Sequence, residues 1–121
     1  MSADDDVFIA GDRPSEEVRR AIETALAGRF EPSAAQEPLP LLVTGHTFVY
    51  FHDEHDFCDD RDMRFTQYRY WVNVHDTDRD ADRQLAVARR VFEIAQAAGW
   101  KALLARDLQE KVDSYDPHGS G

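Results

Sequence analysis

Two neighbouring segments rich in β-branched and aromatic residues constrain the fold of this chain most. Residues 41–52 and 64–75 are dense in Val, Thr, Phe, Tyr and Trp, a composition typical of β-strands. The polar residues 53–63 separate them. The two segments therefore predict a long β-hairpin with a polar loop at its tip.

Segments with helical periodicity flank this hairpin. Residues 15–27 repeat apolar side chains at helical spacing, with Ser15 as the expected N-cap and Gly28 as the terminator. Residues 80–98 carry a second apolar stripe that ends before Gly99, and Asp78 or Asp80 is the expected N-cap. Two helices are predicted, one on each side of the hairpin.

Short apolar segments predict the first and the last strand along the chain. These are residues 7–10, before the first helix, and residues 100–105, after the second. For residues 100–106 the sequence does not decide between a strand and a helix, because an apolar pattern at helical spacing continues to Tyr115. The order predicts an α+β fold, a ferredoxin-like βαββαβ sandwich with an antiparallel sheet, two helices on one face and an optional short C-terminal helix over about 107–114.

The length of 121 residues favours a single domain. We expect one α+β domain over residues 1–115 and a disordered tail over residues 116–121. The proline-rich residues 31–40 indicate an extended connector inside this domain, because neither side could bury a core alone.

A formal net charge of −10, from 24 acids and 14 bases, disfavours nucleic acid and anionic membranes as partners. A protein partner, basic in character, or a second copy of the chain fits better. The single cysteine, Cys58, excludes a disulfide within the chain. Three consecutive aspartates at residues 4–6 and the absence of a long apolar run predict a cytoplasmic protein without a secretory signal or a membrane span.

Metal sites are weakly indicated and no cofactor is expected. His52, His55 and Cys58 follow one another at three-residue intervals, a spacing that can serve one ion, but no second ligand pair accompanies them. A solvated hairpin tip is the favoured interpretation. The alternating acids at positions 76, 78, 80 and 82 do not form a calcium loop, because Ala81 and Val87 occupy its glycine and glutamate positions. These acids are expected to start the second helix.

Catalytic motifs are missing from the sequence. Cys58 lies among carboxylates, which favour the thiol over the reactive thiolate. There is no G-x-S-x-G elbow and no glycine-rich phosphate loop. No catalytic residue is assigned, and the sequence favours a protein that is not an enzyme while leaving an enzyme open as the alternative.

Alternation along the hairpin divides its side chains between two faces. The expected core-facing set is Val43, Thr47, Val49, Phe51, Tyr68, Tyr70, Val72 and Val74. The opposite set is His46, Phe48, Tyr50, His52, Phe65, Gln67, Arg69, Trp71 and Asn73. Aromatic and arginine side chains of this kind suit an interface, unless the connector or the C-terminal segment covers them.

The leading hypothesis is a non-catalytic acidic protein-binding module, such as an inhibitor, an immunity-type protein or an adaptor. It would use the aromatic face together with the acidic loop residues Asp53, Glu54, Asp56, Asp59 and Asp60. One alternative is a dimeric small-ligand-binding protein or enzyme, with a pocket lined by His46, Tyr50, His52, Arg69 and Trp71. Another is a structural subunit of a larger assembly.

Overall fold

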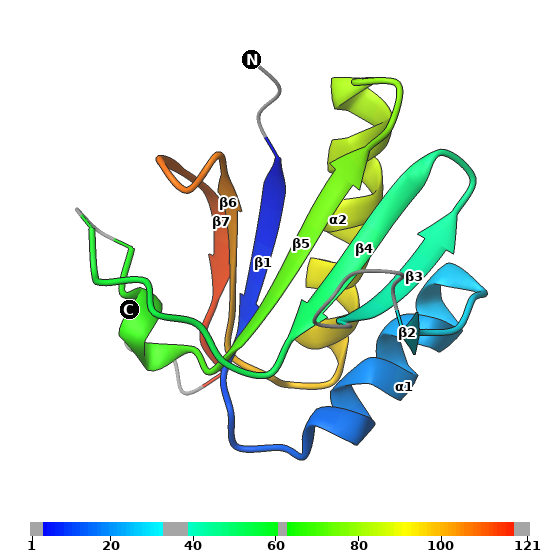
Figure 1. Cartoon of the computed structure of the whole chain (residues 1–121). Helices are drawn as coiled ribbons and strands as arrows, with labels where there is room; N and C mark the ends of the chain where they lie inside the picture. Colours follow the sequence, from blue (N-terminus) through cyan, green and yellow to red (C-terminus); the bar gives the residue numbers. More distant parts are fainter. Residues whose placement is uncertain (1–3, 33–38, 61–62, 118–121) are drawn as a thin grey trace.

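A seven-stranded antiparallel sheet forms the framework of the computed structural model, which describes residues 4–32, 39–60 and 63–117 (Figure 1). The strands are β1 (Asp5–Ile9), β2 (Glu31–Pro32), β3 (Pro40–Thr44), β4 (Thr47–His52), β5 (Tyr70–Asp76), β6 (Ala102–Arg106) and β7 (Glu110–Tyr115). Their order in the sheet is β2-β3-β4-β5-β1-β6-β7. The α+β class is confirmed. The ferredoxin-like topology is not, because this sheet is larger and its strand order differs.

Two helices, α1 (Ser15–Leu26) and α2 (Ala81–Ala97), pack against one face of the sheet (Figure 1). Both were predicted within one residue of their ends. Helix α1 buries Val18, Ile22 and Leu26, which recur at helical spacing. The apolar stripe of α2 packs against Val7, Val72 and other inward-facing side chains of the sheet. This helix-covered face holds the main hydrophobic core.

The helix ends agree with the sequence only in part. Asp80 caps α2, and its side chain accepts a hydrogen bond from the backbone N–H of Arg83. The predicted Ser15 cap of α1 is wrong: Pro14 is the N-cap, and no side chain caps that end. At the other end, Ala27 rather than Gly28 adopts the left-handed conformation, with φ 54°.

Residues 41–52 form two strands and not one. Gly45, with φ 57°, and His46 make a tight turn between β3 and β4. The turn reverses the chain, so Val43 pairs with Phe48 and lies on the face away from the helices, with 52% of its surface exposed. The expectation that Val43 faces the core is therefore wrong, whereas Thr47, Val49 and Phe51 are buried as expected.

The C-terminal segment is a β-hairpin, so the optional helix over 107–114 is wrong. Residues 107–109 join β6 and β7, and Asp107 and Leu108 both adopt left-handed φ angles, 54° and 57°. The backbone N–H of Gln109 donates to the Arg106 carbonyl at 3.0 Å, which closes a turn with two consecutive left-handed residues at its centre, a type that matches the twist of the flanking strands. The closing strand expected over 100–105 is present as β6.

Residues 53–60 and 63–69, here called the covering segment, fold back over the face away from the helices. Strand β5 begins only at Tyr70, and residues 65–67 form a short 3₁₀ turn. Phe57, Met63, Phe65 and Tyr68 pack with Phe8, Leu103 and Ala105 in a second apolar cluster. The expectations of a strand starting at Arg64 and of a Tyr68 in the helix-covered core are therefore wrong, whereas the acidic residues at the tip of the loop are exposed, as expected of a solvated tip.

Two further sequence expectations fall largely outside the described residues. Most of the connector, residues 33–38, and the end of the tail, residues 118–121, are not described. Within the described parts of the chain, neither helix is long and apolar enough to cross a membrane.

Candidate functional site

The sheet face away from the helices, here called the open face, is divided into two halves. The covering segment lies over the half formed by β1 and β6. On the other half, β3, β4 and β5 present Val43, Phe48, Tyr50, His52, Trp71, Asn73 and His75, which the strand registers place side by side. Apart from the exposed Val43, these side chains are half-buried. Of the predicted binding residues, Phe48, Tyr50, His52 and Trp71 lie on this uncovered half.

Trp71 marks the border between the two halves. The His52 ring stacks on it, with ring centres 3.9 Å apart and an interplanar angle of 16°. Phe57 of the covering segment meets the same indole edge to face at 4.8 Å. Burial, and secondarily the neighbouring His55, lowers the pKa of His52. Burial in the stack therefore favours the neutral form of the imidazole over the charged form.

Asp6 lies directly beside this border and is 2% exposed. The Trp71 indole N–H and the Asn73 amide each donate to its Oδ1, both at 2.8 Å. Burial raises the pKa of Asp6 to about 6; the two hydrogen bonds oppose the shift, and the neighbouring Asp4 and Asp5 add to it. Asp6 is thus a buried carboxyl that ionises close to neutral pH.

Asp4 is linked to the same group. The Asn73 amide also donates to Asp4 Oδ2 at 3.2 Å, and His75 Nδ1 lies 2.8 Å from Asp4 Oδ1. The backbone N–H of Asp107 in the β6–β7 turn donates to the Asp4 carbonyl at 2.8 Å. This bond fixes the turn beside the two carboxyls.

A cleft of about 280 Å³, here called the acidic cleft, opens at this point. Its polar lining is Asp4, Asp6, Asn73 and Asp107, and its apolar walls are Phe57, Trp71 and Leu108. Leu108 reaches the cleft from a left-handed backbone position that costs a residue with a Cβ about 1–2 kcal/mol. Acidic and apolar residues thus line the same cleft.

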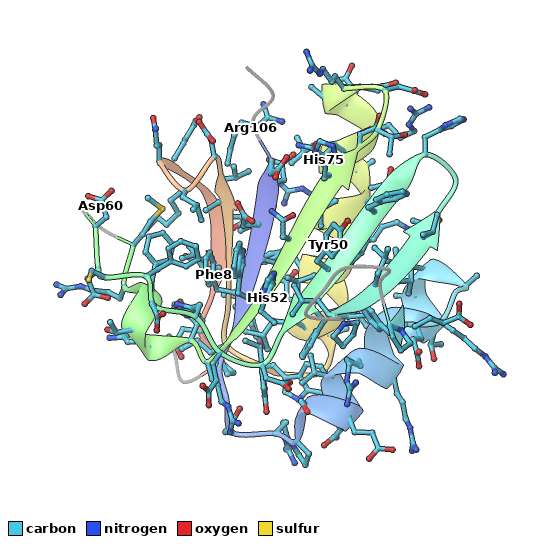
Figure 2. The ribbon with its side chains drawn as sticks, in the orientation of Figure 1. Phe8, Tyr50, His52, Asp60, His75 and Arg106 are labelled. Atoms are coloured by element: carbon cyan, nitrogen blue, oxygen red, sulfur yellow. The ribbon has the colours of Figure 1, made fainter. Side chains whose placement is uncertain are left out.

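A different acid cluster occupies the helix-covered face at the same end of the sheet. Asp5 is fully buried, and it accepts hydrogen bonds from Arg106 Nε at 3.1 Å and from Gln84 Nε2 at 3.0 Å. Figure 2 shows Arg106, the partner of Asp5, and His75, the partner of Asp4, near the same end of the sheet. Both oxygens of Asp5 are therefore occupied.

Asp76 anchors the rest of that cluster. The Arg83 guanidinium binds both of its oxygens, at 2.6 and 2.9 Å, and Thr47 donates at 3.2 Å. The backbone N–H groups of Asp78 and Asp80 also donate to it. These bonds, above all those from Arg83, hold the pKa of Asp76 well below its usual range. The acids of residues 76–82 thus organise the start of α2, as the sequence predicted.

The predicted binding residues do not all reach the uncovered half. His46 lies in the β3–β4 turn, with Nδ1 3.3 Å from Asp78 Oδ2. Arg69 precedes β5, is exposed, and donates from Nε to the Asp53 carbonyl at 3.3 Å. Phe65 is part of the covering segment and is buried against Phe8. These three assignments to the sheet face are wrong: Phe65 and Arg69 precede β5, which starts later than its composition indicates, and His46 lies in a turn that the sequence did not predict.

The predicted acidic loop residues Asp53, Glu54, Asp56, Asp59 and Asp60 are exposed. Asp59 accepts hydrogen bonds from the backbone and the hydroxyl of Thr66, and these lower its pKa. Figure 2 shows Asp60 at the outer end of the covering segment, apart from Tyr50 and His52 on the sheet. The tip of the loop and the aromatic side chains therefore belong to separate parts of the surface.

The histidines that were weak candidates for metal ligands, His52 and His55, contact other protein groups. His55 Nε2 lies 2.5 Å from the Tyr68 carbonyl, and its Nδ1 accepts from the backbone N–H of Phe57. Cys58 is exposed. Within residues 4–32, 39–60 and 63–117, no group of three or more His, Cys, Asp or Glu side chains could hold a metal ion.

Sequence reasoning did not find the acidic cleft. It treated Asp4 and Asp6 only as evidence against a secretory signal, and it left Asp107 and Leu108 without a role. One signal was available: Asp4, Asp6 and Phe8 alternate with Asp5, Val7 and Ile9, which places charges on both faces of one strand. Aspartate is disfavoured in strands, so this pattern indicates a specific use.

Comparisons of the chain with protein-family models, with curated proteins and with solved structures gave no match. A function for this protein must therefore be argued from the geometry and the charge of its own surface.

Proposed function

We propose that the protein is a non-catalytic, acidic protein-binding module, in the manner of an inhibitor or adaptor, and that it engages a basic partner through the uncovered half of the open face. The observation that carries this proposal is the accessible apolar surface there. Val43 is 52% exposed, and Phe48 and Tyr50 lie beside it with their rings 6.3 Å apart. Large aromatic side chains of this kind supply much of the buried area in protein interfaces.

The charge of the chain supports a basic partner. The formal net charge of −10 would accelerate encounter with a positively charged surface and would oppose binding of nucleic acid. The single cysteine fits a reducing compartment such as the cytoplasm, where we place this activity.

The sheet order supports a finer proposal on the fold. Strands β4, β5, β1 and β6 are consecutive in the sheet. We infer that they form, with α1 and α2, a ferredoxin-like core to which β2, β3 and β7 were added at the edges. Such additions at the edges would leave the uncovered half of the open face available for binding.

The test compares two surface variants in affinity capture and then with the purified partner. Tyr50→Ser should weaken binding at least tenfold, whereas Thr24→Ala on the exposed side of α1 should leave it unchanged. Binding of the wild type should also weaken as the salt concentration rises. A partner that binds Tyr50→Ser as well as the wild type would show that another surface is used.

The acidic cleft favours a second candidate function, a dimer that binds a small ligand between two open faces. Light scattering separates the two. A stable dimer whose formation is lost in Tyr50→Ser would favour the ligand-binding dimer, and a monomer at micromolar concentration would favour the module with a separate partner.

A further inference from the structure

His55 joins the two described stretches of the covering segment through both nitrogens of its ring. Its Nε2 lies 2.5 Å from the carbonyl oxygen of Tyr68, and its Nδ1 accepts a hydrogen bond of 3.2 Å from the backbone N–H of Phe57. A carbonyl oxygen can only accept, so Nε2 carries a proton; an N–H can only donate, so Nδ1 carries none. One form of the imidazole satisfies both contacts, and it is the neutral Nε2–H tautomer.

Phe57 is the residue that this hydrogen bond positions. Its ring meets Phe8 of β1 and Trp71 of β5 edge to face, with ring centres 5.8 and 4.8 Å apart. The His55 ring packs edge to face on Phe8 at 5.2 Å and lies 5.3 Å from the Phe57 ring. His55 and Phe57 therefore hold each other in place over the covered half of the open face, directly beside Trp71.

A second proton on this imidazole has to enter at Nδ1, because Nε2 already carries one. The new Nδ1–H would point at the backbone N–H of Phe57, so two donors would face each other and the amide would lose its acceptor. The bond from Nε2 to the Tyr68 carbonyl would remain. Protonation therefore breaks the contact that positions Phe57 and leaves the other contact intact.

Titratable and charged groups surround His55 on several elements of the described chain. They are Glu54, Asp56, Tyr68 and Arg69 of the covering segment, His52 of β4 and Lys101 before β6. From β1 the ring meets the apolar Phe8. Glu54 and Asp56 are exposed, so water screens the attraction that they offer to an imidazolium. The charge of His55 lowers the pKa of His52, so these two rings oppose each other's protonation.

We propose that His55 is an acid-sensitive switch: its neutral ring holds Phe57 against Trp71, and protonation at Nδ1 releases Phe57 and the residues around it from the sheet. Unperturbed histidines gain this proton between about pH 8 and pH 5, which is the range in which the switch acts. Release removes one of the side chains that cover Phe8 and frees one side of Trp71. Apolar surface is thereby added at the border of the uncovered half. This inference does not rest on the protein-binding function, and its test needs no partner.

The first measurement reads the protonation state of His55 in the purified full chain. Two-bond ¹H–¹⁵N correlation spectra of the imidazole distinguish the two neutral tautomers and the imidazolium. We expect the Nε2–H tautomer at pH 7.5 and its conversion to the imidazolium as the pH is lowered to 5. An Nδ1–H tautomer at pH 7.5, or a ring that is still neutral at pH 5, would overturn the proposal.

The second measurement follows release itself, through hydrogen exchange of the Phe57 backbone amide. Because the released form binds a proton that the closed form excludes, its population rises by up to about tenfold for each unit of falling pH. Protection of the Phe57 amide, corrected for the intrinsic pH dependence of exchange, should fall accordingly, and the nuclear Overhauser effect between the Phe57 and Trp71 rings should disappear. The amide of Val72 in the central strand β5 should keep its protection. Constant protection of Phe57 while His55 becomes an imidazolium would refute the switch.

Two matched variants assign the response to His55. His55→Asn removes the titration and keeps an acceptor for Phe57, because an asparagine side chain can accept from the backbone N–H two residues further on. Its Phe57 protection should be the same at pH 7.5 and pH 5. His46→Asn makes the same change at an exposed histidine in the β3–β4 turn and should keep the wild-type response.

The variants also show which results count against the switch. A folded His55→Asn protein that still loses Phe57 protection in acid, or a His46→Asn protein that no longer does, would assign the release to another group and overturn the proposal. If His55→Asn does not fold, the two wild-type measurements decide. None of these outcomes bears on the protein-binding function, which is tested at Tyr50.

Discussion

Two groups of aspartates lie back to back across one end of the sheet, and they differ in the charge of their partners. On the helix-covered face, Asp5 and Asp76 are fully buried and hydrogen-bond Arg106 and Arg83. Each of these carboxylates has a guanidinium within hydrogen-bond distance. Partnered buried charges of this kind hold elements in place.

On the open face the donors to Asp4 and Asp6 are mostly uncharged. Trp71 and Asn73 supply neutral N–H groups, and His75 carries charge only when protonated. The consequence is opposite pKa shifts: the pKa of Asp76 falls, and that of Asp6 rises to about 6. The first group has guanidinium donors within the fold, whereas the second has neutral donors and His75. That contrast separates a structural acid cluster from a candidate binding site.

The largest effect should come from Asp76→Asn. The amide cannot accept from Arg83 and Thr47 as the carboxylate does, and its NH₂ would face donors of the β5–α2 junction. Loss of one partner of a buried ion pair leaves the other uncompensated, so we expect the melting temperature at pH 7 to fall by about 10 °C or more. Calorimetry measures the change.

The wild type supplies a pH control for this result. Since the folded-state pKa of Asp76 is depressed, its stabilising contribution is present above the ordinary aspartate pKa and is lost as pH falls below it. The difference in melting temperature between the wild type and Asp76→Asn should therefore shrink toward acid pH. A constant difference would contradict the role of the ionised carboxylate.

Asp6→Asn should act in the opposite direction. A folded pKa raised from 3.8 to about 6 makes the Asp6 contribution most favourable below the unfolded value and removes it as pH rises through about 6. At pH 7.5 the ionised, buried carboxylate is destabilising, and the neutral amide should raise the free energy of unfolding by up to about 3 kcal/mol. Urea unfolding at pH 7.5 and pH 4.5 checks this, because the gain should vanish at the lower pH. A loss of stability at pH 7.5 would mean that Asp6 already has a cationic partner in the folded chain.

Sequence patterns predicted the elements whose signals are local. The apolar stripe of α2, its Asp80 cap and the alternation of Phe48, Tyr50 and His52 follow from neighbours within a few residues. Each was correct because local preference and tertiary environment agree there. The helix-covered face of the sheet was therefore predictable.

The acidic cleft was not predictable because it is assembled from distant segments. Trp71 and Asp6 are 65 residues apart, and His75 and Asp4 are 71 apart. The covering segment also escaped prediction, since Met63 and Phe65 are buried by contact with Phe8 and Leu103 of the distant strands β1 and β6 and not by a local pattern. The β3–β4 turn was missed because a single Gly45 marks it within residues of high strand preference.

The smallest effect should come from His75→Asn, which tests whether Asp4 has the same kind of partner as Asp76. Asparagine can place an amide near the position of Nδ1 and so keep a donor to Asp4, but it removes the charge that the imidazole carries when protonated. The two side chains are each 34% exposed, and ion pairs at this exposure contribute less than about 1 kcal/mol. We therefore expect urea unfolding at pH 6 to show a loss below that value. A loss as large as that of Asp76→Asn would mean that His75 compensates Asp4 as fully as Arg83 compensates Asp76, and the cleft would then have less negative charge to offer a ligand.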